Sequence, residues 1–419
     1  MIVKKDIFYR ALLVVLFFIP TVFSSVEVTI ALCVLLSSLL LFDLKFKFSN
    51  TFFNAVIPLV LILLIAGTGT FFFTHEPYDI LKDFVYLVKP ILMIVLGYYL
   101  IGKIADKEFI FKVIIYIAVV FAIYHIYRVT KYLSGFQFGI TKIRSVGGKA
   151  NYIELLALVF LHLKNRSRYY TLPAKYITIF KLILYVSFVF YFSRTMLFTF
   201  FILYFAINGY TKLTRKGVVY ITAIIVALGI LFASLQTMDL DRSSLGFEGF
   251  LYKIKNAPSE ILTTKIDRED HSDLWDHWRG YEANRAFEQL GDTKHGLGYV
   301  FGKGLGSLVD LGFYAPLNRD KIRYIPVLHN GLAYIMFKAG FLGMFIYLLF
   351  LAYLYLQAYQ QPLSDHVTFF NNAISGMGLY FFFTTLIITG IYNQGDTVTI
   401  ALGAFIYLKH VHQKKALEL

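Results

Sequence analysis

Residues 217–236 read GVVYITAIIVALGILFASLQ, a run of twenty residues without a charged side chain. A helix of about 20 apolar residues crosses the hydrocarbon core of a bilayer, and a continuous apolar run indicates a helix rather than an alternating barrel strand. Comparable runs recur along the 419 residues, of which 58% are hydrophobic and 16% charged. Soluble domains carry about a quarter charged residues. The sequence therefore predicts an all-α polytopic membrane protein.

Twelve runs are predicted to be transmembrane helices. They are residues 8–24, 26–42, 53–73, 84–102, 108–128, 151–163, 176–192, 195–209, 217–236, 328–356, 367–389 and 396–408. Basic residues precede the first run, as in a signal peptide, but the second run follows at once and favours an uncleaved span. The chain thus divides into 1–236 with helices 1–9, a large outer loop at 237–327, and 328–419 with helices 10–12.

Basic residues in short loops indicate which side of the membrane faces the cytoplasm. Five clusters agree on one orientation: Lys45 and Lys47; Lys103 and Lys107; Lys164, Arg166, Arg168 and Lys175; Lys212, Arg215 and Lys216; and Lys409, Lys414 and Lys415. Both termini are therefore expected in the cytoplasm, in a bacterial inner membrane. This placement explains most of the net charge of +14 without nucleic acid as a partner.

The outer loop, residues 237–327, has a different composition. It contains 12 basic and 14 acidic residues, a net charge of −2, so the rest of the chain carries +16. A water-exposed segment of this length is a functional candidate. A helix is expected from Ser272 to about Leu290, and a glycine-rich stretch follows it. The helix carries a stripe of Leu274, Trp275, Trp278 and Tyr281, and the stretch contains Gly296, Gly298, Gly302, Gly304, Gly306 and Gly312.

Arg194 interrupts an apolar series at the expected tip of a hairpin, 176–209. An arginine at this depth is costly unless it pairs, reaches water or has a function. It either extends to the membrane surface from a helix end or directs its guanidinium group at a phosphate on the outer face. Both interpretations are open on position alone.

The loop 129–150 is expected on the outer face, yet it is basic and contains no acid. Its basic residues are Lys131, Lys142, Arg144 and Lys149. Either short translocated loops tolerate some positive charge, or this loop binds an anionic group. We favour the second interpretation and take Arg144 as a substrate-binding candidate.

Further candidates lie near the end of the outer loop. Arg279 and Arg285 flank Glu282 at a spacing of three residues, so ion pairs on the helix surface are the alternative to substrate binding. Lys303, in the glycine-rich stretch, is another substrate-binding candidate. His329 and Asn330 stand where the chain re-enters the membrane. Asn330 is a further substrate-binding candidate, and a histidine at this place is either a helix cap or a general base near neutral pH.

The sequence predicts neither a metal nor a cofactor. Asp239 and Asp241 form a D-x-D pair, but two acids at a helix exit are common and no further ligands accompany them. Cys33 is the single cysteine, so there is no disulfide framework and no thiolate cluster. The glycine-rich stretch lacks the strand–helix unit that frames nucleotide loops.

Four segments together resemble the O-antigen ligase and O-antigen polymerase family of bacterial surface-polysaccharide assembly. They are Arg144-Ser-Val-Gly147 before Asn151, Ser193-Arg194-Thr195, Trp278-Arg279 before the glycine-rich stretch, and His329-Asn330-Gly331-Leu332 before Gly340 and Gly343. The resemblance covers about residues 140–350. One departure is Lys338, where relatives often have an acidic or neutral residue.

The resemblance implies a metal-independent, inverting, GT-C-like glycosyltransferase that uses a glycan carried on undecaprenyl diphosphate. Arg194 and Arg279 match the arginines that hold the diphosphate, and His329 matches the proposed base. The acceptor is either another lipid-linked repeat, as for a polymerase, or the lipid A core, as for a ligase. Several outer arginines could serve two diphosphates, which slightly favours a polymerase. The implied partners are the lipid-linked donor, the glycan acceptor, the bilayer and other polysaccharide-assembly proteins.

Two other classes compete with this interpretation. A polysaccharide-unit flippase or transporter also commonly has twelve spans, but it should show repeat symmetry and helices broken near the midplane. A membrane scaffold without catalysis would leave Arg194 and His329 unexplained.

Overall fold

The computed structural model describes residues 5–23, 25–41, 47–135, 139–242, 244, 246–263, 265–317 and 320–418. Lys45 of the basic clusters lies outside them. Each of the twelve predicted runs coincides with a helix. These helices are α1 (Lys5–Val22), α2 (Val26–Leu41), α3 (Asn50–Thr70), α4 (Pro77–Lys103), α5 (Phe109–Leu133), α7 (Asn151–Leu161), α8 (Ala174–Phe190), α9 (Arg194–Ile207), α10 (Arg215–Gln236), α16 (Gly331–Leu356), α17 (Asp365–Ile387) and α18 (Val398–Leu417).

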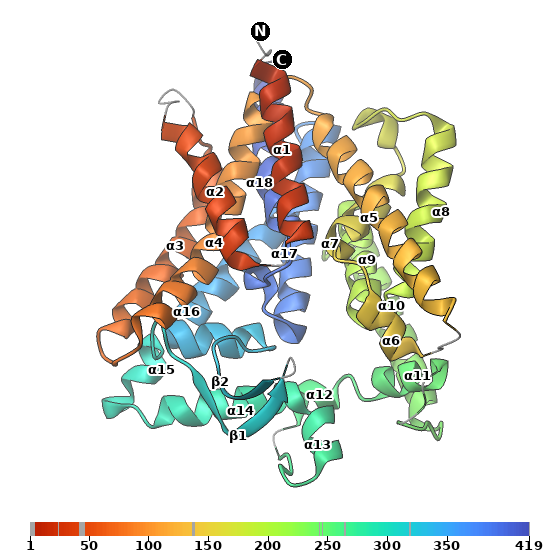
Figure 1. Ribbon diagram of the computed structural model, residues 1–419. Helices are drawn as coiled ribbons and strands as arrows, with labels where there is room; N and C mark the ends of the chain where they lie inside the picture. The colour runs from red at the N-terminus through yellow and green to blue at the C-terminus, as the bar shows by residue number, and fades with distance from the viewer. Residues whose placement is uncertain are drawn as a thin grey trace.

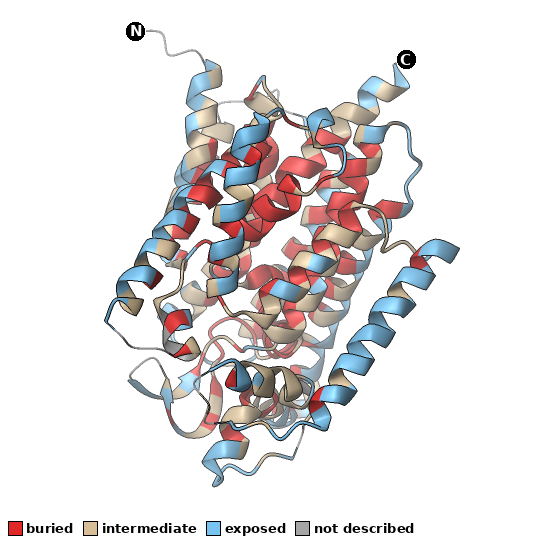
Figure 2. Ribbon diagram, turned by 90° about the vertical axis from the view of Figure 1, so that its right-hand side faces the viewer, coloured by how far each residue is buried: buried red, intermediate tan, exposed pale blue. Residues whose placement is uncertain are grey.

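The length and composition of these helices indicate a membrane-associated protein. Five of them in the described part of the chain are long and apolar enough to cross a bilayer: α3, α4, α5, α10 and α16. Shorter apolar helices include α7 and α9. Helix α10 is the most apolar of the five and is almost entirely exposed along the side of the bundle (Figure 2). An apolar helix without protein around it is suited to lipid and not to water.

Close backbone contact holds the centre of the bundle together. Helix α18 packs along α4, and two glycines make this contact possible. A Cβ atom on Gly97 would lie 2.1 Å from the carbonyl oxygen of Ile400, and one on Gly403 would lie 2.1 Å from that of Ile94. Small residues at such crossings are typical of helices that pack in membranes, where dispersion contacts replace the hydrophobic effect.

The chain ends and the predicted outer loop lie at opposite ends of the bundle. The start of α1 and the end of α18 are together at one end, and residues 237–327 cover the other (Figure 1). This segment contains short elements. They are α11 (Phe247–Lys255), α12 (Ser259–Leu262), α13 (His271–Asp276), α14 (Trp278–Gly291), α15 (Leu297–Phe301), β1 (Val309–Leu317) and β2 (Asp320–Ile325). A further short helix outside this segment, α6 (Ile140–Val146), precedes α7.

Two details of this segment differ from the sequence prediction. The helix expected from Ser272 to Leu290 begins at His271, capped by Asp270, and is divided at His277 into α13 and α14. The fold is also not purely helical, because β1 and β2 form an antiparallel pair in which Val309 is opposite Ile325. No secondary structure was predicted for residues 309–325, because alternation of apolar and polar residues is weak over this short hairpin.

The glycine-rich stretch connects the outer segment to the bundle. Gly304 has φ of +81°, and a Cβ atom there would lie 2.2 Å from the backbone nitrogen of Thr70 in α3. Gly340, at a kink inside α16, has φ of +67° and a hypothetical Cβ 2.1 Å from the carbonyl oxygen of Val300. Glycine is favoured at both positions because it adopts positive φ without strain and has no side chain to clash. These glycines therefore serve close packing against α3 and α16.

Candidate functional site

Two arginines from distant segments share one carboxylate. Arg194, the first residue of α9, places Nη2 3.2 Å from Oε2 of Glu260 in α12. Arg279 of α14 places Nη1 2.6 Å from Oε1 of the same carboxylate. Both arginine side chains are about four-fifths buried, and the buried Nε of Arg279 has no hydrogen-bond partner among the described residues. The arginine donors therefore exceed the acceptors that surround them.

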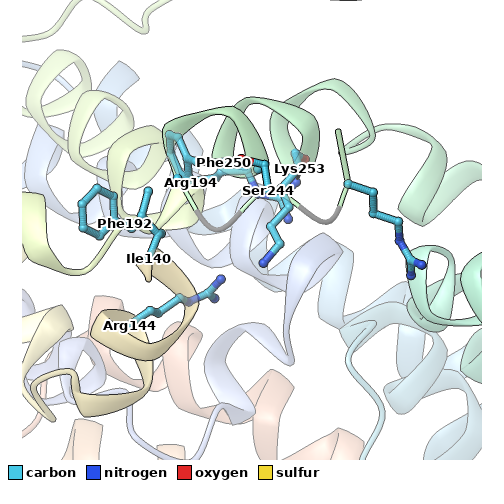
Figure 3. Close-up of a pocket in the computed structure, with 10 residues that line it drawn as sticks. Ile140, Arg144, Phe192, Arg194, Ser244, Phe250 and Lys253 are labelled. Atoms are coloured by element: carbon cyan, nitrogen blue, oxygen red, sulfur yellow. Dashed lines mark hydrogen bonds between the residues drawn. The ribbon is translucent and has the colours of Figure 1, made fainter. Parts of the chain in front are cut away.

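A third arginine and a lysine lie beside this pair. Arg144 of α6, Arg194 and Lys253 of α11 line one cavity of about 200 Å³, and Figure 3 shows their side chains gathered around it. Burial and the charge of Arg279 lower the pKa of the Arg144 guanidinium, and the charge of Glu260 raises it. Burial and the charges of Arg144 and Arg194 lower the pKa of the Lys253 amine. Four cations thus lie near the carboxylate of Glu260. The cavity itself is lined by the basic residues Arg144, Arg194, Arg242 and Lys253, and not by Arg279 or Glu260, and this lining suits an anion with more than one negative charge.

The hairpin tip is shaped to present Arg194. Ser193 caps α9, because its side chain accepts a hydrogen bond from the backbone nitrogen of Met196. Phe192, which also lines the cavity, has φ of +42°, a left-handed conformation that is strained for a residue with a side chain. The free backbone N–H groups at the start of a helix also favour anions. Arg194 therefore reaches the cavity from a helix end that itself favours negative charge.

His329 is paired with a buried glutamate. Its Nδ1 atom lies 3.1 Å from each oxygen of Glu282, and its backbone N–H donates to Oε2 of Glu282 at 2.8 Å. The carboxylate of Glu282 is almost fully buried and the histidine ring is 54% exposed. The hydrogen bond to Glu282 raises the pKa of His329 despite its partial burial, the charge of Arg279 lowers it, and that of Glu260 raises it. His329 is thus within electrostatic range of Arg279, one of the three residues of the arginine cluster (Arg144, Arg194 and Arg279).

Asn330 has a structural role in the described residues. Its Oδ1 accepts hydrogen bonds from the backbone nitrogens of Leu332 and Ala333, at 3.0 and 3.2 Å, and so caps α16. This cap fixes the start of the helix immediately after His329. A helix cap was one of the two roles expected for His329, but the side chain that caps the helix is that of Asn330.

Arg285 and Lys303 do not join the arginine cluster. Arg285 pairs with Glu288 on its own helix and donates through Nε to the carbonyl oxygen of Asp310 at 3.1 Å. Lys303 lines a separate cavity of about 480 Å³ with Phe72 and Asp292. Burial lowers the pKa of the Lys303 amine. Both residues remain substrate-binding candidates on sequence grounds alone.

Lys338 is part of a buried ion pair inside the bundle. Its Nζ atom lies 2.5 Å from Oδ2 of Asp83 in α4 and also donates to the carbonyl oxygen of Ser307. The same aspartate oxygen accepts from the backbone nitrogen of Gly306 at 2.7 Å. The lysine therefore connects α16, α4 and the glycine-rich stretch, which accounts for its charge without a substrate.

The other residues that the sequence suggested for anion or metal binding either make contacts away from the cavity or lie outside the residues that the structure describes. Lys149 donates to the carbonyl oxygen of Val22 at 2.9 Å, and the side chain of Lys142 is outside the described part of the chain. The backbone nitrogen of Asp241 donates to Glu248 at 2.8 Å. No three metal-ligating side chains are grouped within the described ranges.

Comparison with known proteins does not add to this geometry. No family model matches the chain, and no curated protein matches it.

Two residues of the site, Glu260 and Lys253, were not predicted from the sequence. The pairing of Glu282 with His329 was not predicted either. Glu282 was noted only as a helix-surface partner of Arg279 and Arg285, at the spacing that favours such pairs. Its position in the apolar stripe of the helix, four residues from both Trp278 and Ala286, was the signal for another role, since glutamate is rarely buried without a partner. Glu260 and Lys253 carry no comparable signal, because their positions depend on how the outer segment folds back.

Proposed function

We propose that this chain is a membrane glycosyltransferase of the O-antigen ligase and polymerase kind. It would transfer a glycan from undecaprenyl diphosphate to a sugar hydroxyl at the outer face of a bacterial inner membrane. The observation that carries the proposal is the convergence of Arg144, Arg194 and Arg279 near Glu260 at one end of an apolar bundle, with Arg279 within electrostatic range of the His329–Glu282 pair. The resemblance noted in the sequence points to the same residues.

The arginine cluster supports a diphosphate as the leaving group. Guanidinium groups bind phosphate oxygens through paired hydrogen bonds, and Arg279 has an unused donor. A diphosphate attached to a polyprenyl chain must approach from the membrane. The cavity is lined by residues of α6, of the hairpin tip before α9 and of α11, and these elements lie at one end of the apolar bundle (Figures 1 and 3).

The His329–Glu282 pair supports general base catalysis. If Nδ1–H donates to Glu282, the lone pair of Nε2 is available to the acceptor hydroxyl. Nε2 takes the hydroxyl proton as the acceptor oxygen forms a bond to the anomeric carbon, and the bond from that carbon to the diphosphate oxygen breaks. The electron pair leaves with undecaprenyl diphosphate, where the arginines stabilise the developing charge. A single displacement inverts the configuration at the anomeric carbon.

We also propose how the chain is arranged in the membrane. All twelve apolar helices would span the membrane, with both termini in the cytoplasm and residues 237–327 in the periplasm. The common end of α1 and α18, opposite to α11–α14, supports this arrangement (Figure 1). The basic loops favour the cytoplasm as the side of the termini.

The test is an assay of the purified full-length protein with an undecaprenyl-diphosphate oligosaccharide, with and without lipid A core. Released undecaprenyl diphosphate and glycan products are both measured. Longer lipid-linked glycan in the absence of core would support a polymerase, which we favour, and product on the core alone would support a ligase. No glycosidic product under either condition would refute the proposal.

Variants separate the two halves of the mechanism. Arg194→Lys and Arg279→Lys should each raise the donor KM and lower kcat, because lysine cannot reproduce a paired hydrogen bond. His329→Ala should lower kcat by roughly 10²–10⁴-fold, the usual range for a lost general base, with little change in donor affinity. Arg323→Lys is the control, because Arg323 is an arginine of the outer segment that pairs with Asp310, and it should behave like the wild type.

One structural feature favours the alternative of a flippase or transporter. The connection between α17 and α18 is largely buried, and the buried Lys89 of α4 donates to the carbonyl oxygens of Asn393 and Gln394 in it, both at 2.6 Å. Irregular backbone whose carbonyl oxygens bind a cation inside the bundle is typical of transporters. Protein in liposomes that moves the lipid-linked glycan between leaflets, equally well with His329→Ala, would favour transport over transfer.

A further inference from the structure

A buried polar network lies in the bundle beneath the arginine cavity. Glu154 of α7 is completely buried and accepts hydrogen bonds from Ser187 of α8 at 2.5 Å and from Tyr191, the residue after α8, at 2.8 Å. Ser187 also lies 2.8 Å from Nδ1 of the buried His125 in α5. Three helices are thus joined by side chains that would each be costly to bury alone.

The direction of these hydrogen bonds follows from their chemistry. The Ser187 hydroxyl donates its one proton to Glu154, so Nδ1 of His125 must donate to Ser187. The Nε2 atom of His125 is buried without a partner among the described residues. Such a network contributes little net stability compared with apolar side chains of the same volume. Its role therefore lies in the segments that it supports.

One end of the network supports the hairpin tip. Tyr191 is two residues before the capping Ser193 and three before Arg194. Between them, Phe192 has the strained φ of +42°, a conformation that persists only when its surroundings determine it. The hydrogen bond from Tyr191 to Glu154 fixes the residue immediately before that strained position.

The other end supports the loop that follows Arg144. Gly147 and Gly148 connect α6 to α7, and the backbone of Gly148 lies directly on Tyr191 and His125. A Cβ atom on Gly148 would be 2.4 Å from the Tyr191 hydroxyl and 3.0 Å from Cβ of His125. One tyrosine hydroxyl therefore contacts both arms of the cavity, the arm with Arg144 and the arm with Arg194.

We propose that Glu154, Ser187 and Tyr191 are positioning residues that set the separation between Arg144 and Arg194 and thereby the affinity for the donor diphosphate. The network touches no substrate itself. The inference rests on the proposed function for the identity of the donor, but the spacing of the two arginines can be tested with a diphosphate alone.

The test compares Tyr191→Phe and Ser187→Ala with the wild type in the purified full chain, with inorganic pyrophosphate as the probe. Loss of a hydrogen bond that orders both arms should raise the pyrophosphate Kd and the donor KM by about tenfold, the usual effect of one buried hydrogen bond. The acceptor KM should not change. Tyr170→Phe is the matched control, because Tyr170 is also buried and donates to the carbonyl oxygen of Phe160 at 2.8 Å.

The outcomes separate the inference from the proposed function. Tyr191→Phe and Ser187→Ala proteins that bind pyrophosphate as tightly as Tyr170→Phe would overturn the positioning role. Binding that depends on Arg194 and Tyr191 without any glycosyl transfer would refute the proposed function and leave the positioning role intact. Failure of the wild type to bind pyrophosphate would overturn both.

Discussion

Replacement of Glu282 by glutamine tests the link between the buried carboxylate and the base. Glu282 accepts from both the ring and the backbone N–H of His329. Glutamine has nearly the same shape, and its carbonyl oxygen in the place of Oε2 can accept from both N–H groups, but it carries no charge. Both hydrogen bonds to His329 therefore lose the charge that strengthens them.

The size of the effect follows from the geometry. A hydrogen bond to a charged group contributes about 1.5–3 kcal/mol. The lower value applies here, because the ring of His329 is 54% exposed and water screens the pair. A loss of about 1.5 kcal/mol corresponds to about tenfold in kcat/KM. We expect this loss at the pH optimum, with the protein still folded.

The pH dependence should change in a defined direction. Glu282 raises the pKa of His329 in the wild type, so the neutral form that can act as a base is present only at higher pH. Without the carboxylate the pKa falls, and the neutral form persists to lower pH. The acidic limb of the kcat/KM profile should therefore move to lower pH in Glu282→Gln.

Turnover is measured across pH with a lipid-linked donor, together with thermal unfolding in detergent. Glu288→Gln is the control, because Glu288 is on the same helix, 61% exposed, and paired with Arg285. It should leave both the rate and the profile unchanged. A folded Glu282→Gln enzyme with wild-type kcat/KM and an unmoved acidic limb would refute the assignment of His329 and Glu282 as a catalytic pair.

Four other predictions concern binding, stability and topology. Glu260→Gln should increase pyrophosphate affinity severalfold in calorimetry, because it removes an internal anion that competes for the arginines; weaker binding would contradict this. Lys338→Met leaves its aspartate partner buried and unpaired, so it should cost about 3–5 kcal/mol, seen as a lower Tm in detergent. Activity should survive EDTA, and Asp241→Asn should remain active; rescue only by a divalent cation would argue otherwise. An impermeant thiol reagent applied from outside should label Lys265→Cys and not Arg168→Cys, and the reverse would overturn the proposed topology.

The positions of the long helices could be predicted because their signal is local. A run such as 217–236 identifies itself by composition, and the helix observed, Arg215–Gln236, differs by two residues at one end. The predicted positions of helix ends were less accurate where polar residues extend a helix beyond its apolar part. Helix α4 begins at Pro77 although the predicted run starts at 84, since its first turns contain charged residues that reach the surface.

The site was predictable only in part, because its parts come from distant segments. Arg194 was selected because it interrupts an apolar series, Arg144 because its outer loop is basic, and Arg279 as an arginine of the outer-loop helix that matches the family motif; the fold brings these three together. Arg285 was selected from the same helix as Arg279 but faces the β-hairpin, at Asp310. No spacing along one helix distinguishes Arg279 from Arg285, since each is three residues from Glu282. The distinction depends on which helix face meets α12, and this is a property of tertiary structure.

Helix α14 explains how the two halves of the site keep a constant separation. Arg279 and Glu282 are three residues apart, so they are displaced by about 4.5 Å along the helix axis and lie on neighbouring faces. One of them holds Glu260 in the arginine cluster and the other holds His329. Gly280 lies between them, and a Cβ atom there would be 2.7 Å from the carbonyl oxygen of Thr263. The segment that carries Glu260 can therefore approach α14 closely. In the proposed mechanism, this single turn would hold the leaving diphosphate at a fixed distance from the base, as an in-line displacement requires.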